Sequence, residues 1–422
     1  MVKSYDVLVA GAGPAGAAAA AVLAGQGLSV ALLDRAEHPR PKLCGGLLTA
    51  KSVDALARIF GLGLADLTRR GGLFHQTPQY LFLHRGRELL RGAAAEPFRF
   101  VDRPAFDALL TAVAVGRGAE YLPGRTVERC DAALGLVRLR GGGELVGRFV
   151  IGADGANSVT RRALGASGAG GPGGVGGSDR AAWRRNLAAA IEVELPVGSG
   201  PGQFPRAVLV PELHVGSPAA GYGWVFPGPR GPKVGICGLR RADRDGRDFG
   251  ALFLDFLRLL GVAEPEGVAL HGHPLPYGNA LARSTSGRLL LAGDAGGFVE
   301  PLFGEGIFYA LATGAHAASG VLCGLRMGVK MGEAAAGAEY ERLLARTVRP
   351  ELVWSDRLRW LLFWAMQNLG AGPIRGFVKS APAALAEMVH GRRSFRLLFG
   401  KTWEWGEGVG PALPRDSGGA AD

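Results

Sequence analysis

Short apolar runs alternate with small-residue turns at the start of the chain. Residues 5–9 (YDVLV) form an apolar run that leads into a glycine-rich turn, as expected for a buried parallel strand. An alanine-rich stretch then predicts a long helix, and residues 29–33 predict a second strand. A strand, a tight turn, a helix and a second strand in this order predict a βαβ unit.

The same succession of a buried strand and a glycine turn returns twice further along the chain. Residues 148–164 have the pattern of a strand, a Gly-Ala-Asp-Gly turn and a helix. Residues 287–314 have the pattern of a strand, a Gly-Asp turn, a loop and a long helix that starts near Gly306. Three such elements, far apart in the sequence, indicate one α/β domain assembled from separate segments.

Between these segments the pattern is that of short strands. Strand-like runs occur at 188–195, 206–212 and 221–229, and residues 249–262 fit one amphipathic helix. The pattern becomes helical from about residue 346. We therefore expect 1–72, 100–165 and 275–345 to form the α/β domain, 73–99 and 180–274 a β domain, 166–179 a glycine-rich linker, and 346–422 a helical region.

The first turn has the glycine spacing of a dinucleotide-binding site. Gly11 suits a tight turn, Gly13 lets a pyrophosphate approach the backbone, and Gly16 lets helix and strand pack closely. The start of the helix directs free N–H groups at the phosphates. Asp34, at the end of the second strand, is placed to accept ribose hydroxyls. Because strand, helix and acid all stand at the right spacing, we predict dinucleotide binding rather than an empty glycine turn.

Other stretches resemble known functional motifs, but the residues around them do not support those functions. Residues 168–173 match the glycine spacing, but no strand-like run precedes them. Residues 400–402 (GKT) resemble a phosphate-binding loop, yet Phe395 stands where the first glycine of that loop belongs. His271 and His273 have no evident carboxylate partner, so we expect no metal site. The sequence has no GxSxG elbow, which argues against a serine hydrolase.

Composition and net charge restrict the functional classes that remain. A hydrophobic fraction of 48% suits a globular protein with a large core, and the net charge of +11 suggests contact with anions such as a phosphorylated substrate or an anionic membrane surface. No known pattern supports a nucleic-acid partner. The four cysteines form no CxxC pair, the start shows no cleavable signal, and no apolar run reaches the roughly 18 residues of a membrane span. We expect a cytoplasmic protein, with peripheral membrane contact left open.

The three glycine turns together resemble the FAD-dependent family that includes p-hydroxybenzoate hydroxylase. In that family a GxGxxG turn, an Asp-Gly pair and a Gly-Asp pair converge on one FAD. The resemblance implies an α/β Rossmann-like FAD-binding domain with an inserted antiparallel β substrate domain and a helical C-terminal region. The cofactor-binding residues it implies are Gly11, Gly13, Pro14, Ala15, Gly16, Asp34, Arg35, Cys44, Gly45, Arg103, Asp154, Gly155, Gly293, Asp294, Pro301, Gly304, Gly306 and Ile307.

Residues 39–48 (PRPKLCGGLL) are similar to the geranylgeranyl reductases of this superfamily. They match the pattern P..K.CGG.L, whereas halogenases and aromatic hydroxylases have different loops at this point. The resemblance places Cys44 beside the flavin ring, where the thiol would tune the flavin or relay a proton, and Lys42 could favour its thiolate. The alternative is that Cys44 only fits a tight loop.

A second box agrees with this resemblance. Residues 222–227 (YGWVFP) match the YxWxFP box of the reductases. Tyr222, Trp224 and Phe226 alternate, so they share one face of a strand and are the implied substrate-binding residues. The Gly-x-Gly that normally follows the box is altered, because Cys237 replaces its second glycine.

The resemblance implies an FAD-dependent reductase that saturates isolated double bonds of a geranylgeranyl or other polyprenyl chain by hydride transfer from the flavin. An isoprenoid diphosphate, a lipid, a quinone or a chlorophyll-type ester could carry that chain. No second nucleotide fingerprint occurs, so an external donor, NAD(P)H or ferredoxin-type, would supply the electrons. The alternatives are an FAD monooxygenase or halogenase acting on an aromatic or polyketide substrate, and a lipid-binding module. Residues 351–370 would form a helix that touches the membrane or one that caps the substrate domain.

Overall fold

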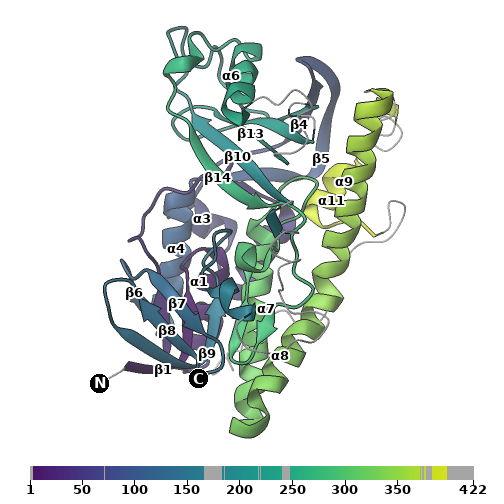
Figure 1. Cartoon of the computed structure of the whole chain (residues 1–422). Helices are drawn as coiled ribbons and strands as arrows, with labels where there is room; N and C mark the ends of the chain where they lie inside the picture. Colours follow the sequence, from purple (N-terminus) through teal and green to yellow (C-terminus); the bar gives the residue numbers. More distant parts are fainter. Residues whose placement is uncertain are drawn as a thin grey trace, which may run out of the picture.

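The computed structural model describes residues 3–70, 72–165, 183–184, 186–216, 218, 220–239, 248–370, 372, 375–376 and 383–396. These residues form two eight-stranded sheets, one in each half of the molecule, with helices packed on the first sheet and along one side of both (Figure 1). The expected α/β class with a largely antiparallel second sheet and a helical C-terminal part is confirmed. The expected linker at 166–179 lies outside the described residues.

The first sheet has a parallel centre. Strands β16, β9, β1, β2 and β6 run parallel in this order, β15 pairs antiparallel with β16, and the β7–β8 hairpin is attached to β9. Strands β1 and β2 are buried on both faces where they meet, which explains why their sequences are continuous apolar runs. The strands are β1 (Lys3–Ala10), β2 (Val30–Leu33), β6 (Glu120–Leu122), β7 (Val127–Asp131), β8 (Leu136–Leu139), β9 (Glu144–Gly152), β15 (Thr285–Ser286) and β16 (Leu289–Leu291).

Helices cover one face of this sheet, and the β7–β8 hairpin covers the other. Helix α1 (Pro14–Ala24) is buried along its whole length and packs against α4 (Arg103–Gly116) and α7 (Ile307–Arg326). A Cβ at Gly314 of α7 would lie only 2.1 Å from the carbonyl oxygen of Ala15, so glycine is needed for this close approach. The smaller helices α2 (Ala50–Phe60) and α3 (Leu64–Arg69) complete this half.

Helix α7 is long and apolar enough to cross a membrane, so the expectation that no run reaches that length was wrong. Its most apolar stretch is 83% buried inside the protein, against α1, α2 and α8. In this structure α7 is therefore the central core helix of the first half.

The second sheet is antiparallel except where β11 pairs with β4. The strand expected at 206–212 was wrong, because β11 begins only at Glu212, and Pro205 and Pro211 lack the N–H groups that a ladder needs. The strand order is β14, β10, β13, β12, β11, β4, β5 and β3. The bounds are β3 (Leu47–Leu48), β4 (Leu73–His84), β5 (Arg87–Val101), β10 (Leu187–Glu194), β11 (Glu212–Val215), β12 (Gly221–Phe226), β13 (Lys233–Leu239) and β14 (His271–Pro276).

The two faces of the second sheet have different neighbours. Val225 and Ile236 point to the outer face and pack against α6 (Phe249–Leu259). Tyr222 points to the opposite face and donates a hydrogen bond to the carbonyl oxygen of Phe303, in the first half of the molecule. Alternate residues of β12 therefore separate the sheet's own core from its contact with the first half.

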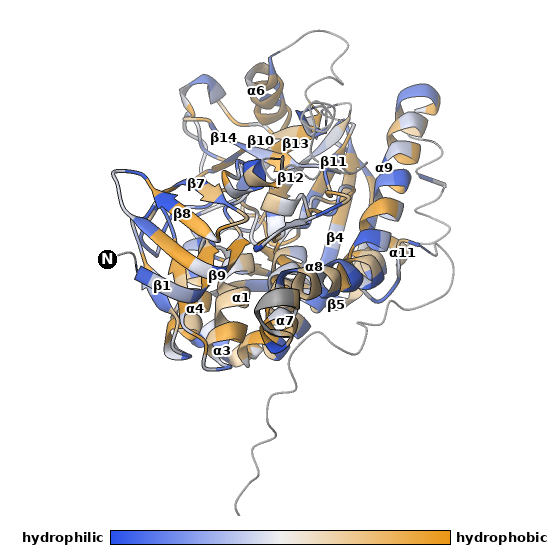
Figure 2. Ribbon diagram, turned by 60° about the horizontal axis from the view of Figure 1, so that its bottom comes forward, coloured by the Kyte–Doolittle hydropathy of each residue, from blue (hydrophilic) through white to orange (hydrophobic). Residues whose placement is uncertain are grey.

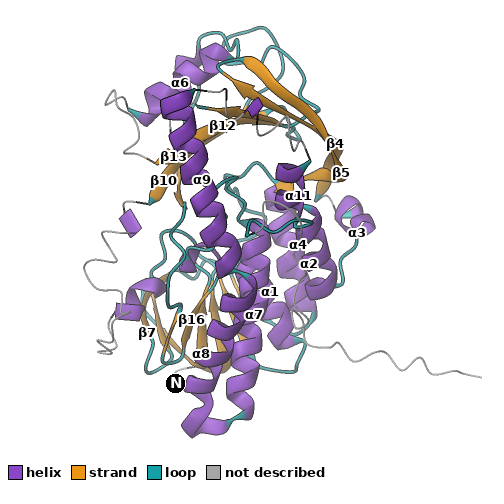
Figure 3. Ribbon diagram, turned by 90° about the vertical axis from the view of Figure 1, so that its right-hand side faces the viewer, coloured by secondary structure: helices purple, strands orange, loops and turns teal. Residues whose placement is uncertain are grey.

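The C-terminal helices run along both halves (Figures 1 and 3). Helix α8 (Gly328–Thr347) packs on α7, and α9 (Arg349–Leu369) continues from it to the edge of the second sheet. Helix α11 (Ala384–His390) contacts β5. The buried carboxylate of Glu351 in α9 accepts hydrogen bonds from the Ser394 hydroxyl and a backbone N–H, and this fixes the segment after α11 to α9. Hydrophobic and hydrophilic residues alternate along α9 (Figure 2).

Candidate functional site

The glycine turn between β1 and α1 leaves an open helix start. Gly11 has a φ of +104°, and a Cβ there would lie 2.3 Å from the carbonyl oxygen of Ala153. A Cβ at Gly16 would lie 1.8 Å from the carbonyl oxygen of Gly11, so both glycines are required by the fold itself. Gly13 differs, because a Cβ there would meet only the Arg40 guanidinium, at 3.9 Å. The space beside Gly13 is therefore free for a phosphate at the N-terminus of α1.

Asp34 is buried at the end of β2 and is held ionised by its surroundings. Its carboxylate accepts hydrogen bonds from the backbone N–H groups of Ala12 and Ala36 and pairs with Arg40 at 3.1 Å. Burial by itself would raise the pKa of Asp34, but His38, Arg40 and these N–H groups outweigh it and hold the pKa well below its usual value.

In the loop after Asp34, it is Arg40 that pairs with the Asp34 carboxylate. Arg35 was the predicted cofactor residue, but its side chain is exposed. Arg40 instead pairs with Asp34, faces Gly13 and lies 3.9 Å from Asp107. The fold of the 35–40 loop decides which arginine lies at this position, and no motif in the sequence indicated Arg40.

The carboxylate of Asp154 is fully occupied within its own turn. It accepts hydrogen bonds from the hydroxyl groups of Ser158 and Thr160 and from the backbone N–H groups of Val159 and Thr160. It thereby caps the short 3₁₀ helix Thr160–Gly165. The adjacent Gly155 has a φ of +79° and open space around it. Asp154 shapes this turn, and Gly155 leaves it accessible.

The second glycine-acid pair lies against α1 and α7. Gly293 has a φ of +58°, donates its N–H to the hydroxyl of Thr313, and a Cβ there would lie 3.0 Å from the Ala15 methyl. Asp294 faces the start of α7, where a Cβ at Gly306 would lie 3.7 Å from its Oδ1. Within the described part of the chain, no hydrogen bond or ion pair engages the Asp294 carboxylate. That carboxylate is thus free to accept a hydroxyl of a ligand.

The loop from Glu300 to Gly306 is held rigidly by two carboxylates. Glu300 accepts hydrogen bonds from the backbone N–H groups of Leu302 and Phe303, at 2.6 and 2.7 Å, and from the Ser355 hydroxyl. Burial raises the pKa of Glu300 to about 7 in spite of these donors. Pro301 is buried, and Gly304 has a φ of +70°.

The second carboxylate, Glu305, forms a buried ion pair with Lys51 of α2 at 2.5 Å. It also accepts a hydrogen bond from the Thr49 hydroxyl at 2.8 Å. Lys51 lies over the rings of Phe308 and Tyr309 at the start of α7, just after the buried Ile307. These contacts fix the start of α7 relative to α2.

Arg103 and the cysteine loop meet at the start of α4. Arg103 is buried and forms a two-bond ion pair with Asp107, with both distances at 2.9 Å. Burial alone would lower the pKa of Arg103, but Asp107 and the nearby Cys44 sulfur raise it well above its usual value. Arg103 therefore brings a permanent positive charge to the cysteine loop.

The cysteine loop, residues 42–46, is held between the two halves. The N–H of Cys44 donates to a carboxylate oxygen of Glu192 in β10 at 2.9 Å. The Lys42 ammonium lies 2.9 Å from Nε2 of His273 in β14. Burial lowers the pKa of both groups, that of His273 to about 4. A Cβ at Gly45 would lie 2.5 Å from the ring of Phe226, so the loop packs directly on β12.

The aromatic box lies on the face of β12 that looks toward the cysteine loop. The rings of Tyr222, Trp224 and Phe226 follow one another at centroid distances of 6.0 and 6.5 Å. Cys237 lies opposite Tyr222 in the neighbouring strand, and burial raises the pKa of its thiol to about 12. Cys237, which replaces the second glycine expected after the box, is therefore a buried neutral group beside Tyr222.

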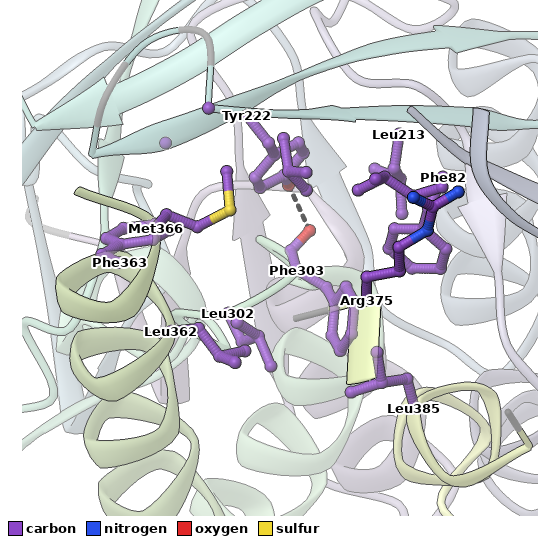
Figure 4. A pocket seen from close by; sticks show the side chains of 14 residues that line it. Phe82, Leu213, Tyr222, Leu302, Phe303, Leu362, Phe363, Met366, Arg375 and Leu385 are labelled. Atoms are coloured by element: carbon purple, nitrogen blue, oxygen red, sulfur yellow. Dashed lines mark hydrogen bonds between the residues drawn. The ribbon is translucent and has the colours of Figure 1, made fainter. Parts of the chain in front are cut away.

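An apolar cavity adjoins Tyr222 and the Glu300–Gly306 loop (Figure 4). The cavity has a volume of about 70 Å³ and lies between the second sheet, α9 and α11. Tyr222 and Leu213 line it from the sheet, Phe303 from the loop, and Met366 from α9. Arg375 is the charged residue of the lining, and its side chain is exposed. This composition suits a long apolar ligand with one polar end.

Residues 4–183 match the family model described as an FAD binding domain. Menaquinone reductase from Mycobacterium tuberculosis is 32% identical over 332 residues, which are 75% of this chain and 76% of the relative. Geranylgeranyl diphosphate reductase from Rhodobacter capsulatus is 30% identical over 331 residues, with 77% and 76% covered. The chain belongs to the geranylgeranyl reductase family of FAD-dependent oxidoreductases. A geranylgeranyl bacteriochlorophyll reductase-like protein from Thermoplasma acidophilum has the same fold, with a TM-score of 0.70 at 20% identity over 94% of both chains.

FAD, the cofactor of the geranylgeranyl reductase family, fits the residues present. Gly13 leaves room at the start of α1, and Asp294 has an unengaged carboxylate at the start of α7. Asp34 is ionised and faces the glycine turn through its bond to Ala12 N. The structure thus brings the three glycine turns, Arg103 and the cysteine loop together, although the role of each residue toward FAD stays a prediction.

The second sheet adds residues to the family's site that no motif indicated. Glu192 and His273 contact the cysteine loop directly, and Lys233 donates to the Cys44 carbonyl at 3.5 Å. His273 belongs to the histidine pair for which we expected no metal site, and in the structure it meets Lys42. The only signal in the sequence was the presence of polar residues in strands that are otherwise apolar.

Proposed function

We propose that this protein saturates isolated double bonds of a polyprenyl chain. The observation that carries the proposal is the position of the apolar cavity. It shares Tyr222 with the aromatic box, and it shares Leu302 and Phe303 with the Glu300–Gly306 loop, whose residues the family resemblance assigns to the cofactor. A polyprenyl substrate lying in the cavity would therefore reach the cofactor from the side of the second sheet. In this proposal 1–72, 100–165 and 275–345 hold FAD, and 73–99 and 180–274 hold the substrate. The names of the relatives support it.

When bound, FAD would supply the hydride that is added to one alkene carbon. The chain's own residues would align the alkene, exclude water and provide the proton for the other carbon. An isolated alkene has no carbonyl to polarise, so alignment by the cavity walls and by Tyr222, Trp224 and Phe226 contributes much of the effect. Cys44 and the Lys42–His273 pair belong to the loop that packs on the aromatic box, and both can carry a proton.

The substrate would be an isoprenoid diphosphate, a lipid, a quinone or a chlorophyll-type ester. An external electron donor, NAD(P)H or ferredoxin-type, is part of the proposal, since one glycine fingerprint serves one dinucleotide. The alternative function is a monooxygenase or halogenase acting on an aromatic or polyketide compound. The nearly uniform apolar lining of the cavity favours a chain over a ring with polar substituents.

An anaerobic assay separates these functions. Dithionite-reduced protein, given geranylgeranyl diphosphate without oxygen, is expected to yield products that gain two hydrogens per reduced alkene, as mass spectrometry would detect. We expect Cys44→Ala to retain FAD and to lose activity roughly a hundredfold, a typical contribution of a proton-transferring group.

Cys323→Ala is the matched control, because Cys323 is also half-buried but lies in α7 away from the loop. A Cys44→Ala protein that works at the full rate would show that the cysteine only fits its loop. Product that forms only in the presence of oxygen, and carries oxygen or halogen, would overturn the reductase.

Peripheral membrane contact is the second part of the proposal, and α9 is the element that would make it. Its outward face exposes Val353, Trp354, Trp360, Leu361 and Trp364, each more than a third exposed. These positions recur at helical spacing, with exposed Arg357 among them, and the cavity wall lies on the other side of the same helix. Tryptophan and arginine are favoured at the lipid headgroup level, so the face suits an anionic bilayer.

The double variant Trp360→Ser/Trp364→Ser is expected to reduce binding to phosphatidylglycerol vesicles about tenfold, because burial of even part of such side chains contributes more than 1 kcal/mol. Flotation of protein with vesicles measures the partition. Leu134→Ser, on an equally exposed leucine of the β7–β8 turn, serves as the control and should bind as the wild type does. Equal flotation of all three proteins would exclude α9 as the contact.

A further inference from the structure

Glu192 of β10 contacts two segments that are far apart in the sequence, the cysteine loop and β12. One carboxylate oxygen accepts the N–H of Cys44 at 2.9 Å, and the other accepts the indole N–H of Trp224 at 3.1 Å. The cysteine loop belongs to the first half of the molecule, and Trp224 belongs to the aromatic box of the second. One buried side chain thus joins the loop to the proposed substrate face.

The register of the second sheet explains how Trp224 reaches Glu192. Gly235 of β13 lies directly between them, paired with Glu192 on one side and with Trp224 on the other. A Cβ at Gly235 would lie 2.2 Å from the indole ring, so the absence of a side chain opens the path across the strand. The first glycine after the YxWxFP box therefore has a structural purpose in this chain.

The surroundings make these two hydrogen bonds strong. Glu192 is almost fully buried, and Lys233, one row further along the sheet, donates to the carbonyl oxygen of Cys44. Burial raises the pKa of Glu192, although Lys233 and the two donors act in the opposite direction. A buried carboxyl group that loses one of its donors leaves an unsatisfied polar atom, which is unfavourable.

We propose that Glu192 is a positioning residue that holds Cys44 and Trp224 in fixed relation across the boundary between the two halves. It has no chemical step of its own. It sets where the thiol stands relative to the alkene that the aromatic box holds. The catalytic consequence rests on the proposed function, whereas the position of the cysteine loop does not.

The test is Glu192→Gln, with Glu194→Gln as the matched control two residues along β10. Glu194 is half-buried, and its carboxylate pairs with the exposed Arg230 and accepts the backbone N–H of that residue. In Glu192→Gln one carboxylate oxygen becomes an NH₂ group, which cannot accept from both donors. We expect iodoacetamide to label Cys44 about tenfold faster in the FAD-loaded variant, the effect of removing a hydrogen bond to a buried charged group. Peptide mass spectrometry separates Cys44 from the other three cysteines.

A second substitution distinguishes hydrogen-bond geometry from loss of charge. Trp224→Phe removes the indole donor, so in Glu192→Gln/Trp224→Phe the amide oxygen can turn wholly toward Cys44 N–H. The double variant is therefore expected to label more slowly than Glu192→Gln, toward the wild-type rate. In the anaerobic assay we expect Glu192→Gln to lower kcat about tenfold, and Glu194→Gln to leave kcat unchanged.

Each outcome of the labelling bears on the positioning role alone. Labelling of Glu192→Gln at the wild-type rate would overturn the positioning role. A double variant that labels as fast as Glu192→Gln would also overturn it, because the loss of charge rather than the hydrogen-bond geometry would then explain the faster labelling. If Glu192→Gln does not fold, recovery of a folded, slowly labelled protein in the double variant supports the role, and no recovery overturns it. Altered labelling in a protein with no reductase activity would refute the proposed function while leaving the positioning role intact.

Discussion

Gly13→Ala is expected to yield a folded protein that binds FAD roughly a hundredfold more weakly. An alanine fits the protein itself, since the backbone at Gly13 is extended and a Cβ would approach only Arg40, at 3.9 Å. The same methyl group would stand where the pyrophosphate has to approach the start of α1. Displacing a phosphate from backbone N–H groups removes charge-assisted hydrogen bonds worth about 1.5–3 kcal/mol each, which gives that factor. Titration of the apoprotein with FAD, followed by flavin fluorescence, measures it.

Gly63 provides a close control for this substitution. It is also the N-cap of a helix with an extended backbone, and a Cβ there would meet only the Asp66 carboxylate, at 3.8 Å. Gly63→Ala should therefore bind FAD as the wild type does. Thermal unfolding of both apoproteins should stay within a few degrees of the wild type. Undiminished FAD affinity in Gly13→Ala would place the pyrophosphate elsewhere.

Leu213→Trp is expected to close the apolar cavity and to reduce kcat/KM for a twenty-carbon isoprenoid about a hundredfold. Leu213 points into the cavity from β11, on the wall next to Tyr222 (Figure 4). An indole at this position would occupy space that the chain needs and would shift the alkene from its alignment, and a displacement of about 1 Å is enough for such a loss. FAD binding should not change, because Leu213 lies in the second sheet, whereas the glycine turns follow strands of the first sheet.

The control for this prediction is Leu209→Trp. Leu209 lies four residues earlier and is 66% exposed, so a larger side chain there has room outside the cavity. Its kcat/KM should equal that of the wild type. If Leu213→Trp reduces the isoprenoid at an unchanged rate, the isoprenoid binds outside this cavity.

The sequence predicted those parts of the site that depend on local geometry. Gly11 and Gly16 could be identified because each allows a close approach between neighbouring elements, and such contacts impose fixed spacing. Tyr222 and Trp224 could be placed on one face because residues alternate in a strand. In both cases a short stretch of chain contains most of the physical information.

The other site residues depend on contacts between distant segments. Glu192 meets Cys44 across 148 residues of sequence, and Lys42 meets His273 across 231. No spacing rule connects such pairs, since they are set by how the two sheets face each other. Asp154 shows that a recognised motif does not reveal what its side chain does. The motif was identified from the sequence, but the carboxylate accepts hydrogen bonds from its own turn.

The position of β16 in the first sheet has a consequence for the synthesis of this protein. β16 (Leu289–Leu291) pairs with β9, but nearly 140 residues separate the two strands, including most of the second sheet. Until the ribosome has released residue 291, the edge of β9 that β16 later covers has no partner, and unpaired strand edges promote aggregation. The first half of the molecule must therefore wait for the second to be made. We expect a chain that stops before β16 to depend on chaperones rather than to fold alone.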